Sequence, residues 1–233
     1  MTTSSTPGVL LIGASRGLGY ALAETMLQRG YQVVATGRQH STARLEALAR
    51  RYPTTLRVER VDITVPEQVS ALHQRLLGCE FDMLFVNAGV KNNDGETIAD
   101  VSTDEFIRVM VTNALSPLRV IEAFKDNVTP SGTIAVMSSG QGSLTNNTNG
   151  NYEVYRGSKA ALNMLMRSFA ARHQDEGRTL LLMAPGWVRT DMGGPEARLS
   201  IDESIPNLLN TMEAWQGRTG LHYLDYLGRV VPW

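Results

Sequence analysis

The sequence predicts an α/β fold, a doubly wound parallel sheet with helices on both of its faces. Three observations lead to this prediction. Short apolar runs alternate at least six times with longer helical stretches, and this order produces parallel strands joined by crossover helices. The runs are apolar throughout, as strands covered on both faces are. Hydrophobic residues make up 42% and charged residues 19% of the 233 residues, a composition that fills a sizeable core.

The first half of the chain contains three predicted strands and three predicted helices. Gly30 lies where a glycine commonly caps the end of a helix, and Pro53 stops the helix that precedes it. Pro66 falls in the first turn of a helix, where proline is tolerated. The predicted strands span residues 9–12, 31–36 and 55–60, and the predicted helices span residues 17–29, 42–51 and a stretch that starts near Pro66.

The second half continues the alternation and ends in less regular segments. Its predicted strands span residues 81–86, 132–138 and 179–184, and its predicted helices span residues 103–125, with a bend at Pro117, and 152–175. Residues 139–151 are rich in asparagine and glycine and are expected to form a loop. Residues 190–209 are expected to form a loop with a short helix, and a region at 190–212 is expected to border the substrate. A short strand is expected at residues 222–224.

Composition restricts the class of protein. No linker or repeat divides the chain, so one domain is expected over residues 1–233, with a flexible tail at 1–7. The net charge of −1 and the lack of a basic stripe argue against nucleic acid as a partner. No apolar run is long enough to span a membrane, and the first residues lack the pattern of a signal peptide. Cys79 is the single cysteine, which favours a reducing, cytoplasmic location.

A glycine-rich turn, Gly13-Ala-Ser-Arg-Gly17-Leu-Gly19, lies between the first predicted strand and the first predicted helix. Glycines at such a turn let a ligand approach the backbone closely, and the free N–H groups at the start of the helix bind a pyrophosphate. A tight turn that binds nothing has the same spacing. The position directly after the first strand favours a dinucleotide site.

Two arginines near this turn indicate which dinucleotide would bind. The second strand ends in Ala35-Thr36-Gly37-Arg38 and offers no carboxylate to a free ribose 2′-hydroxyl. Arg16 lies in the turn itself, and two guanidinium groups suit a 2′-phosphate dianion. Each arginine alone is equally consistent with a solvated surface residue. Together they favour NADP over NAD.

A tyrosine, a lysine and a pair of serines are candidates for catalysis. Tyr155 and Lys159 lie four residues apart on a predicted helix and therefore share a face. Reduction of a carbonyl needs a proton donor, and a nearby ammonium lowers the pKa of a phenol. A packed ring beside a lysine that extends to solvent has the same spacing. Ser138 and Ser139 follow the fifth strand, at the sheet edge that binds ligands, where a hydroxyl would hydrogen-bond a carbonyl.

In their order along the chain, these residues resemble the motifs of the short-chain dehydrogenase/reductase family. The resemblance extends from Leu11 to Thr190 and implies a Rossmann-type domain that binds NADP(H) and forms homodimers or homotetramers. Asp62 would contact the adenine, and Asn87-Ala88-Gly89 would line the adenosine side. The cofactor-binding residues that the resemblance implies are Gly13, Ser15, Arg16, Gly17, Leu18, Gly19, Arg38, Asp62, Ile63, Asn87, Ala88, Gly89, Tyr155, Lys159, Pro185, Gly186, Val188 and Thr190.

The resemblance also implies a catalytic set of Ser139, Tyr155, Lys159 and Asn113. Tyr155 would be the acid in reduction and the base in oxidation, and Lys159 would lower its pKa and bind the nicotinamide ribose. Ser139 would orient the carbonyl, and Asn113 would hold the water that links Lys159 to solvent. Val188 and Thr190, in the segment 185–190, would contact the nicotinamide carboxamide.

The segments 155–163, 185–194 and 224–233 resemble the C-factor and sniffer-type carbonyl reductases of that family. The loop between Ser139 and Tyr155 is longer than in many family members, so Ser138 and Ser143 remain alternatives for the working hydroxyl.

The resulting prediction is a reversible, NADPH-dependent reduction of a ketone or aldehyde, with a small-molecule substrate and no nucleic-acid or membrane partner. An NADP-binding sensor or signalling protein of C-factor type is the alternative, and epimerisation or dehydration is a third possibility. Trp187 and Met192 are candidates for lining the substrate pocket. The histidines show no ligand spacing, so no catalytic metal is expected; they are His40, His73, His173 and His222.

Overall fold

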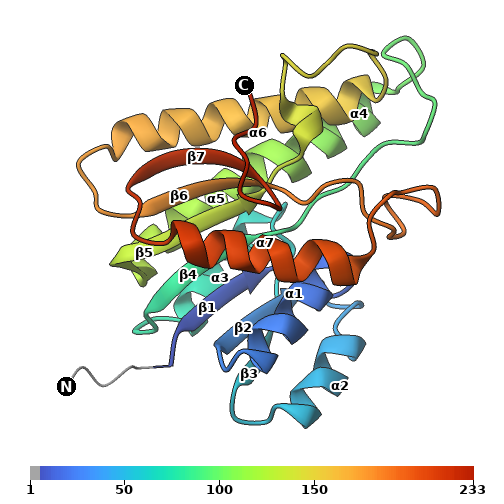
Figure 1. Ribbon diagram of the computed structural model, residues 1–233. Coiled ribbons are helices and arrows are strands. Elements are labelled where there is room, and N and C mark those ends of the chain that lie inside the picture. Colours follow the sequence, from blue (N-terminus) through green and yellow to red (C-terminus); the bar gives the residue numbers. More distant parts are fainter. Residues whose placement is uncertain (1–5) are drawn as a thin grey trace.

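The computed structural model describes residues 6–233, in which a seven-stranded sheet lies between two layers of helices (Figure 1). The strand order is β3-β2-β1-β4-β5-β6-β7, and all neighbouring strands pair in parallel. The predicted doubly wound sheet is therefore confirmed. Most of the tail predicted at residues 1–7 lies outside the described residues. The strands are β1 (Gly8–Ile12), β2 (Gln32–Gly37), β3 (Leu56–Arg60), β4 (Phe81–Val86), β5 (Val128–Met137), β6 (Thr179–Ala184) and β7 (Gly220–Asp225).

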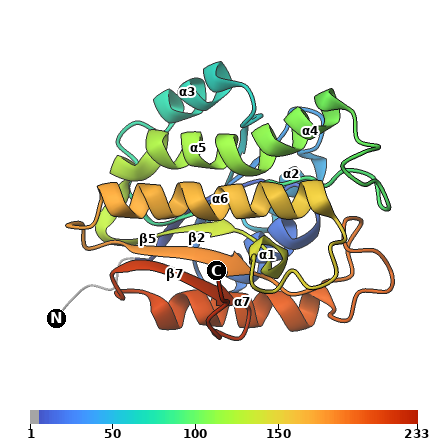
Figure 2. The same ribbon diagram turned by 90° about the horizontal axis from the view of Figure 1, so that it is seen from above.

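The helices bury both faces of the sheet. In β1, Leu10 and Ile12 pack into one core while Val9 and Leu11 pack into the other. The first core lies against α3, α5 and α6, and the second lies against α1, α2 and α7 (Figure 2). The helices are α1 (Gly17–Gln28), α2 (Ala43–Arg51), α3 (Pro66–Arg75), α4 (Thr103–Met110), α5 (Ser116–Phe124), α6 (Glu153–Arg172) and α7 (Ile201–Trp215).

The long helix predicted at residues 103–125 contains an irregular turn. A π-helical segment, Val111–Leu115, joins α4 to α5 without a break in the chain of helical turns. The irregularity lies just before Pro117, where the bend was predicted. Proline lacks the N–H that a regular helix would use, and a widened turn before it accommodates that loss.

Three elements are longer than predicted. The helix after β6 is not short, because α7 has 15 residues and starts at a capping box formed by Ser200 and Glu203. β5 begins at Val128, before the predicted start, and its pairing with β4 shifts register between Phe81 and Met83. β7 extends beyond the predicted residues 222–224. Within residues 6–233, no helix has the length and apolarity needed to span a membrane.

Candidate active site

The predicted site residues gather at the carboxyl ends of the strands. The segments that follow β4, β5 and β6 emerge together at this end, coloured green, yellow and orange on the right of Figure 2. The glycine turn follows β1 at the same edge, beside the point where the strand order reverses between β1 and β4. Doubly wound sheets bind their ligands at this position.

The glycine turn is fixed by contacts within the protein. The N–H of Gly13 donates to Thr36 Oγ1 at 3.1 Å, and Asn87 Nδ2 donates to the Gly13 carbonyl at 2.7 Å. A Cβ on Gly13 would lie 2.7 Å from the Ala88 nitrogen, and one on Gly19 would lie 2.2 Å from the Gly13 oxygen. These glycines allow the end of β1, the start of α1 and the end of β4 to pack closely.

The start of α1 leaves an anion-binding position. Gly17 has φ of +54°, and a Cβ there would meet only Thr190, at 3.9 Å. No side chain caps the first N–H groups of α1, and no acidic residue lies in its first turn. Free N–H groups beside an open glycine fit the pyrophosphate of a dinucleotide. The partly buried Ser15 and Leu18 flank this position.

The two arginines lie at the edge of the glycine turn. Arg38 directly follows β2 and is exposed, and Gly37 packs against Ser15 of the turn. Arg16 is also exposed and forms a 3.3 Å ion pair with Asp191, from the loop after β6. An ion pair as exposed as this one contributes little to stability, so an anion of higher charge can compete for Arg16.

The adenosine-side residues form turns after β3 and β4. The carboxylate of Asp62 accepts hydrogen bonds from the Thr64 N–H at 2.9 Å and the Thr64 hydroxyl at 2.6 Å. The side chain of Ile63 packs in the core, so only its backbone is available to a ligand. Gly89 adjoins both candidate catalytic side chains on the helices: a Cβ there would lie 3.5 Å from Asn113 Oδ1 and from Lys159 Nζ.

α6 presents Tyr155 and Lys159 toward the end of β5. The Lys159 side chain is 3% exposed, and its Nζ donates to the Met137 carbonyl at 2.9 Å. The same Nζ lies 5.8 Å from the centre of the Tyr155 ring. Lys159 forms no ion pair with any residue in the described part of the chain.

Burial dominates the pKa values of this pair. It lowers the pKa of Lys159 to about 8 and raises the pKa of Tyr155 to about 12. The nearby Ser139 side chain lowers the Tyr155 pKa in part, and Tyr223 raises it further. The Lys159 ammonium, which donates to the Met137 carbonyl, is not among the groups that shift the pKa of Tyr155 here. The predicted lowering of the Tyr155 pKa by Lys159 stays a prediction.

The structure distinguishes the three candidate serines. Ser138 is 2% exposed, and its hydroxyl donates to Asn163 Oδ1 at 2.6 Å. Ser143 is 1% exposed and contacts the Trp233 carbonyl and the Asn146 N–H. Ser139 is the only one of the three that is partly exposed; its Oγ accepts from the Gln141 N–H at 3.1 Å, and it is the serine that acts on the pKa of Tyr155. The geometry thus favours Ser139 as the hydroxyl available to a ligand.

Asn113 lies within the π-helical segment. Its Nδ2 donates to the Val90 carbonyl at 2.7 Å and to Ser158 Oγ at 2.9 Å, while its Oδ1 accepts from the Val90 N–H at 2.8 Å. Both amide hydrogens are therefore used within the protein. Single π-helical turns inside helices are frequent at functional sites, and this one is adjacent to Lys159 through Gly89.

The loop after β6 is held together by its own hydrogen bonds. Val188 forms an isolated β-bridge with Leu199. Gly186 has φ of +83°, and a Cβ at this position would lie 2.5 Å from Leu199 Cδ1. Thr190 Oγ1 accepts from the Gly193 N–H at 3.0 Å. Trp187 donates its indole N–H to the Gly193 carbonyl at 2.8 Å and leaves its ring 49% exposed. Pro185 precedes this loop, and Met192 is exposed within it.

Sequence reasoning assigned no role to Asn163, Tyr223 or Trp233, which surround the Ser139 segment. Asn163 follows Lys159 by one helical turn, and that spacing was an available signal. The strand order places Tyr223 beside the site, and the path of the tail places Trp233 there. Neither position can be predicted from the local sequence.

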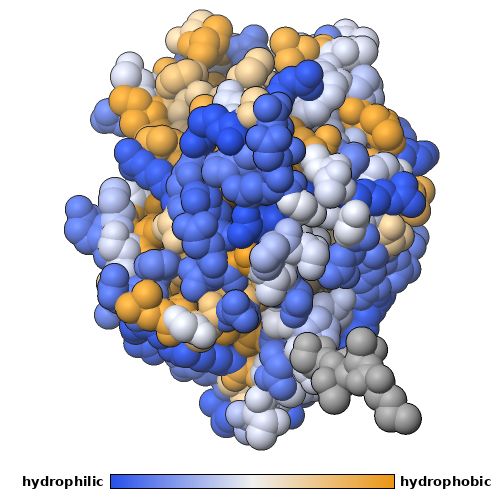
Figure 3. Space-filling view, turned by 90° about the vertical axis from the view of Figure 1, so that its left-hand side faces the viewer, coloured by the Kyte–Doolittle hydropathy of each residue, from blue (hydrophilic) through white to orange (hydrophobic). Residues whose placement is uncertain are grey.

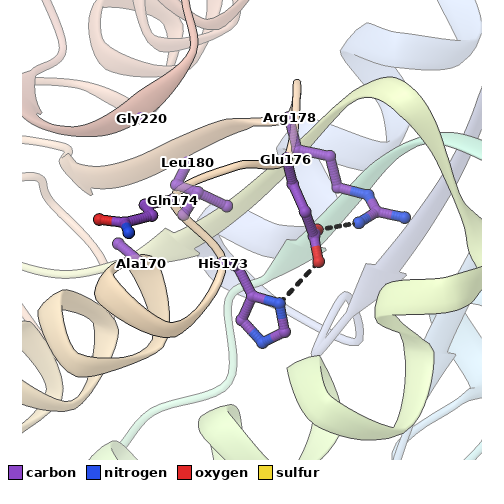
Figure 4. A pocket seen from close by; sticks show the side chains of 7 residues that line it. All are labelled: Ala170, His173, Gln174, Glu176, Arg178, Leu180 and Gly220. Carbon is purple, nitrogen blue, oxygen red and sulfur yellow. Dashed lines mark hydrogen bonds and ion pairs between the residues drawn. The ribbon is translucent and has the colours of Figure 1, made fainter.

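A small pocket lies at the opposite, amino-terminal end of the strands (Figure 4). His173 Nδ1 lies 2.7 Å from Glu176, which also pairs with Arg178. The cavity of about 20 Å³ has room for one water molecule and not for a substrate. Figure 3 shows that the surface at this end is mainly hydrophilic. Residues 6–233 contain no group of three or more His, Cys, Asp or Glu side chains arranged to hold a metal ion.

Comparison with known proteins agrees with this geometry. Residues 8–198 match the model of the short chain dehydrogenase family. A short-chain dehydrogenase/reductase from Burkholderia multivorans with bound NADP is 55% identical, with a TM-score of 0.96 over 98% of this chain and 100% of that chain. A carbonyl reductase from Pseudomonas aeruginosa PAO1 in complex with NADP is 36% identical, with a TM-score of 0.91 over 98% of this chain and 100% of that chain.

The C-signal protein of Myxococcus xanthus is 38% identical over 154 residues, which are 65% of this chain and 92% of that protein. The predicted resemblance to C-factor-type proteins and to carbonyl reductases is therefore confirmed. The glycine turn, the Ser139–Tyr155–Lys159 cluster and the matched residues 8–198 lead to the same conclusion: this chain belongs to the short-chain dehydrogenase family.

Proposed function

We propose that this protein is an NADP(H)-dependent oxidoreductase that reversibly reduces a ketone or aldehyde to an alcohol. The main observation is that Ser139, Tyr155 and Lys159 meet at the carboxyl end of β5, at the sheet edge that also holds the glycine turn. The NADP-bound Burkholderia protein and the Pseudomonas carbonyl reductase support this proposal.

The residues present fit NADP(H). The open N-terminus of α1 would hold the pyrophosphate, and Arg16 and Arg38 would bind the 2′-phosphate. Asp62 and Asn87 would border the adenosine, and the loop that follows β6, with Val188 in it, would border the nicotinamide. The bound cofactor would supply or accept the hydride.

The chain's own groups would move the proton. The Tyr155 phenol is protonated at neutral pH, as that of any tyrosine with its ordinary pKa of about 10 is, and it would donate its proton to a developing alkoxide. Ser139, which is partly exposed at the end of β5, would hold the substrate oxygen in place. Lys159 is buried beside both and would bind the nicotinamide ribose, and Asn113 would hold a water that links Lys159 to solvent.

The remaining assignments concern the surroundings of the site. Residues 190–212, which include the exposed Met192, would border a small-molecule substrate together with the exposed Trp187. The chain would act as one domain and, from its single cysteine, in the cytoplasm. It would form homo-oligomers through an apolar groove lined by Met110, Val111, Ala114, Leu115, Ala161, Met164 and Leu165.

The similarity to C-signal supports a second candidate, an NADP-binding signalling or sensor protein with little turnover. The intact cluster of Ser139, Tyr155 and Lys159 favours the reductase, because a sensor has no need of a proton donor. The two differ in one observable: a sensor binds NADPH and leaves it unoxidised with every carbonyl offered.

The test is NADPH oxidation at 340 nm with a panel of ketones, aldehydes and diketones, for the wild type, Tyr155→Phe and Tyr31→Phe. We expect turnover by the wild type, loss of at least about a hundredfold in Tyr155→Phe and wild-type rates in Tyr31→Phe. Tyr31 is a matched control because its hydroxyl bonds Glu213, away from the site. Tight NADPH binding without oxidation of NADPH would contradict the reductase and support the sensor.

A further inference from the structure

Tyr223 holds the main chain at Ser139. It lies in β7, is 2% exposed, and its hydroxyl donates to the carbonyl of Ser139. The side chains of Ser138 and Asn163 neighbour the same hydroxyl. Asn163 also donates to the Gly142 carbonyl at 3.3 Å, so these contacts connect α6 and β7 to the start of the loop after β5.

Trp233 fixes the other side of this arrangement. The centre of the Trp233 ring lies 5.5 Å from the centre of the Tyr223 ring. The guanidinium of Arg167, from α6, lies 5.0 Å from the centre of the Trp233 ring. The Trp233 carbonyl accepts hydrogen bonds from the Thr145 N–H at 3.1 Å and the Thr145 hydroxyl at 2.7 Å. The N–H of Val231 donates to the Tyr223 carbonyl at 2.8 Å. The segment 230–233 therefore links Tyr223 to the loop at residues 139–145.

The orientation of Ser139 depends on these contacts. The preceding N–H, of Ser138, is fixed to β6 by its bond to the Met183 carbonyl at 2.8 Å. After that point the sheet no longer holds the chain, and the Ser139 carbonyl accepts hydrogen bonds from the Tyr223 hydroxyl and from the Gly142 N–H at 2.9 Å. The bonds at the Ser138 N–H and at the Ser139 carbonyl fix the peptide groups on either side of residues 138–139 and so limit rotation of the main chain at Ser139, while the Ser139 Oγ accepts from the Gln141 N–H at 3.1 Å.

We propose that Tyr223 is a positioning residue that acts through the main chain of Ser139 and keeps the Ser139 hydroxyl in place at the carboxyl end of β5, with Trp233 holding the Tyr223 ring. The inference rests on the proposed function, in which Ser139 orients the substrate carbonyl. Tyr223 is not a catalytic residue, because it bonds the main chain of Ser139 and not a reacting group. Its effect must therefore disappear when the Ser139 hydroxyl is removed.

The test is a double-mutant cycle. Tyr223→Phe is made in the wild type and in Ser139→Ala, and Tyr31→Phe is the control for loss of a partly buried tyrosine hydroxyl. In the wild type we expect Tyr223→Phe to lower kcat roughly tenfold, with the Kd for NADPH unchanged within about twofold. In Ser139→Ala we expect no further loss, because the two residues act as a unit. An equal loss in both backgrounds, or no loss in either, would overturn the proposal.

Hydrogen exchange measures the same contact without turnover. We expect amides 140–146 to exchange faster in Tyr223→Phe than in the wild type, while Tyr31→Phe leaves them unchanged. Trp233→Leu keeps the Tyr223 hydroxyl but removes the packed indole, and should show a smaller increase over the same residues. If the wild type reduces no carbonyl, the proposed function fails, but the hydrogen-exchange comparison still tests the positioning role of Tyr223. Unchanged exchange of amides 140–146 in Tyr223→Phe would overturn that role.

Discussion

Lys159 is a buried cation whose environment is energetically unfavourable. Its amino group is buried, forms no ion pair within residues 6–233, and donates to the neutral Met137 carbonyl. Burial of an ammonium with so little compensation destabilises a fold and lowers the pKa of the group. Such costs are tolerated mainly at functional sites, where a perturbed pKa serves the chemistry.

The pH dependence of stability should report this burial. Between pH 8 and 10.5 the unfolded chain keeps a proton on Lys159 that the folded chain has released, so stability rises with pH in that window. We expect the unfolding free energy of the wild type to include a rise of roughly 2 kcal/mol between pH 7.5 and 9.5 that Lys159→Met lacks. Denaturant titrations at the two pH values measure it. The control is Lys125→Met, which removes an ammonium at an exposed ion pair with Asp126 and should keep the wild-type rise in unfolding free energy. If Lys159→Met also keeps that rise, the Lys159 ammonium is not desolvated as described.

Arg38 should determine the choice between NADPH and NADH. We expect Arg38→Ala to weaken NADPH binding about tenfold or more while leaving NADH binding nearly unchanged, because only NADPH has a 2′-phosphate for a guanidinium to bind. Isothermal titration calorimetry with both cofactors measures the difference. Arg50→Ala removes an exposed arginine from the far end of α2 and serves as the control. Tighter binding of NADH than of NADPH by the wild type would contradict the arginine argument.

At the scale of elements, two glycines in helices show how differently the same residue is constrained. Gly19 lies in the first turn of α1, where a Cβ would be 2.2 Å from the Gly13 oxygen and 2.5 Å from Asn87 Nδ2. Gly157 lies in α6, is exposed, and has no neighbouring atom within 4 Å of the point that a Cβ would occupy. Packing requires the first glycine, whereas the second only lowers the helix propensity of α6.

Alanine at these two positions should therefore change stability in opposite directions. We expect Gly19→Ala to destabilise the protein by about 3 kcal/mol or more, because the contacts are to backbone that cannot move independently. Gly157→Ala should stabilise it by roughly 0.5–1 kcal/mol. Chemical denaturation of both variants beside the wild type tests the pair. A Gly19→Ala protein as stable as the wild type would show that the turn is not packed as described.

Elements with a strong local pattern were predictable, and elements defined by distant partners were not. The strands β4 and β6 were predicted with their observed bounds, because fully buried strands are short, continuous apolar runs. α7 was underestimated because Pro206 and the polar residues at its start are typical of a helix boundary. The start of β5 was missed because Pro130, just before the predicted start at Gly132, is typical of a turn, although pairing of Val128 with β4 keeps this segment in the sheet.

The candidate site divides in the same way. Tyr155 and Lys159 share a helix face through a fixed spacing, so their proximity was predictable. The rise in the pKa of Tyr155 was not predictable, because it depends on how far the surrounding elements exclude water from the phenol. The contacts of Tyr223 and Trp233 with residues 139–145 join segments far apart in the chain, and only the assembled sheet brings them together.

At the scale of the whole molecule, one helix surface remains apolar and uncovered. Met164 is 63% exposed and Leu165 is 39% exposed on α6, beside Leu115 of the π-helical segment at 39%. Together with their neighbours they line the open apolar groove between α6 and the α4–α5 helix. Apolar surface of this kind is typical of an interface between proteins, and the proposed homo-oligomer would bury it.

A charge in this groove should dissociate the oligomer. We expect Met164→Glu to reduce the sedimentation mass to that of a single chain of 25.5 kDa, since a carboxylate buried between two apolar surfaces has no partner. Leu77→Glu places the same charge at a 60% exposed leucine after α3 and should leave the mass unchanged. Sedimentation velocity distinguishes the two, and a wild type that sediments as a single chain would contradict the proposed assembly.

The turn after β7 has a consequence for how such an assembly can grow. Residues 225–231 fold back along the outer edge of β7, where the Arg229 carbonyl accepts from the Asp225 N–H and the Val231 N–H donates to the Tyr223 carbonyl. Backbone groups that would otherwise recruit a strand from another molecule are thus already paired. This pairing hinders a continuous sheet across subunits at the carboxyl-terminal half of β7, whereas the apolar helix surface is available to form a closed, symmetric particle.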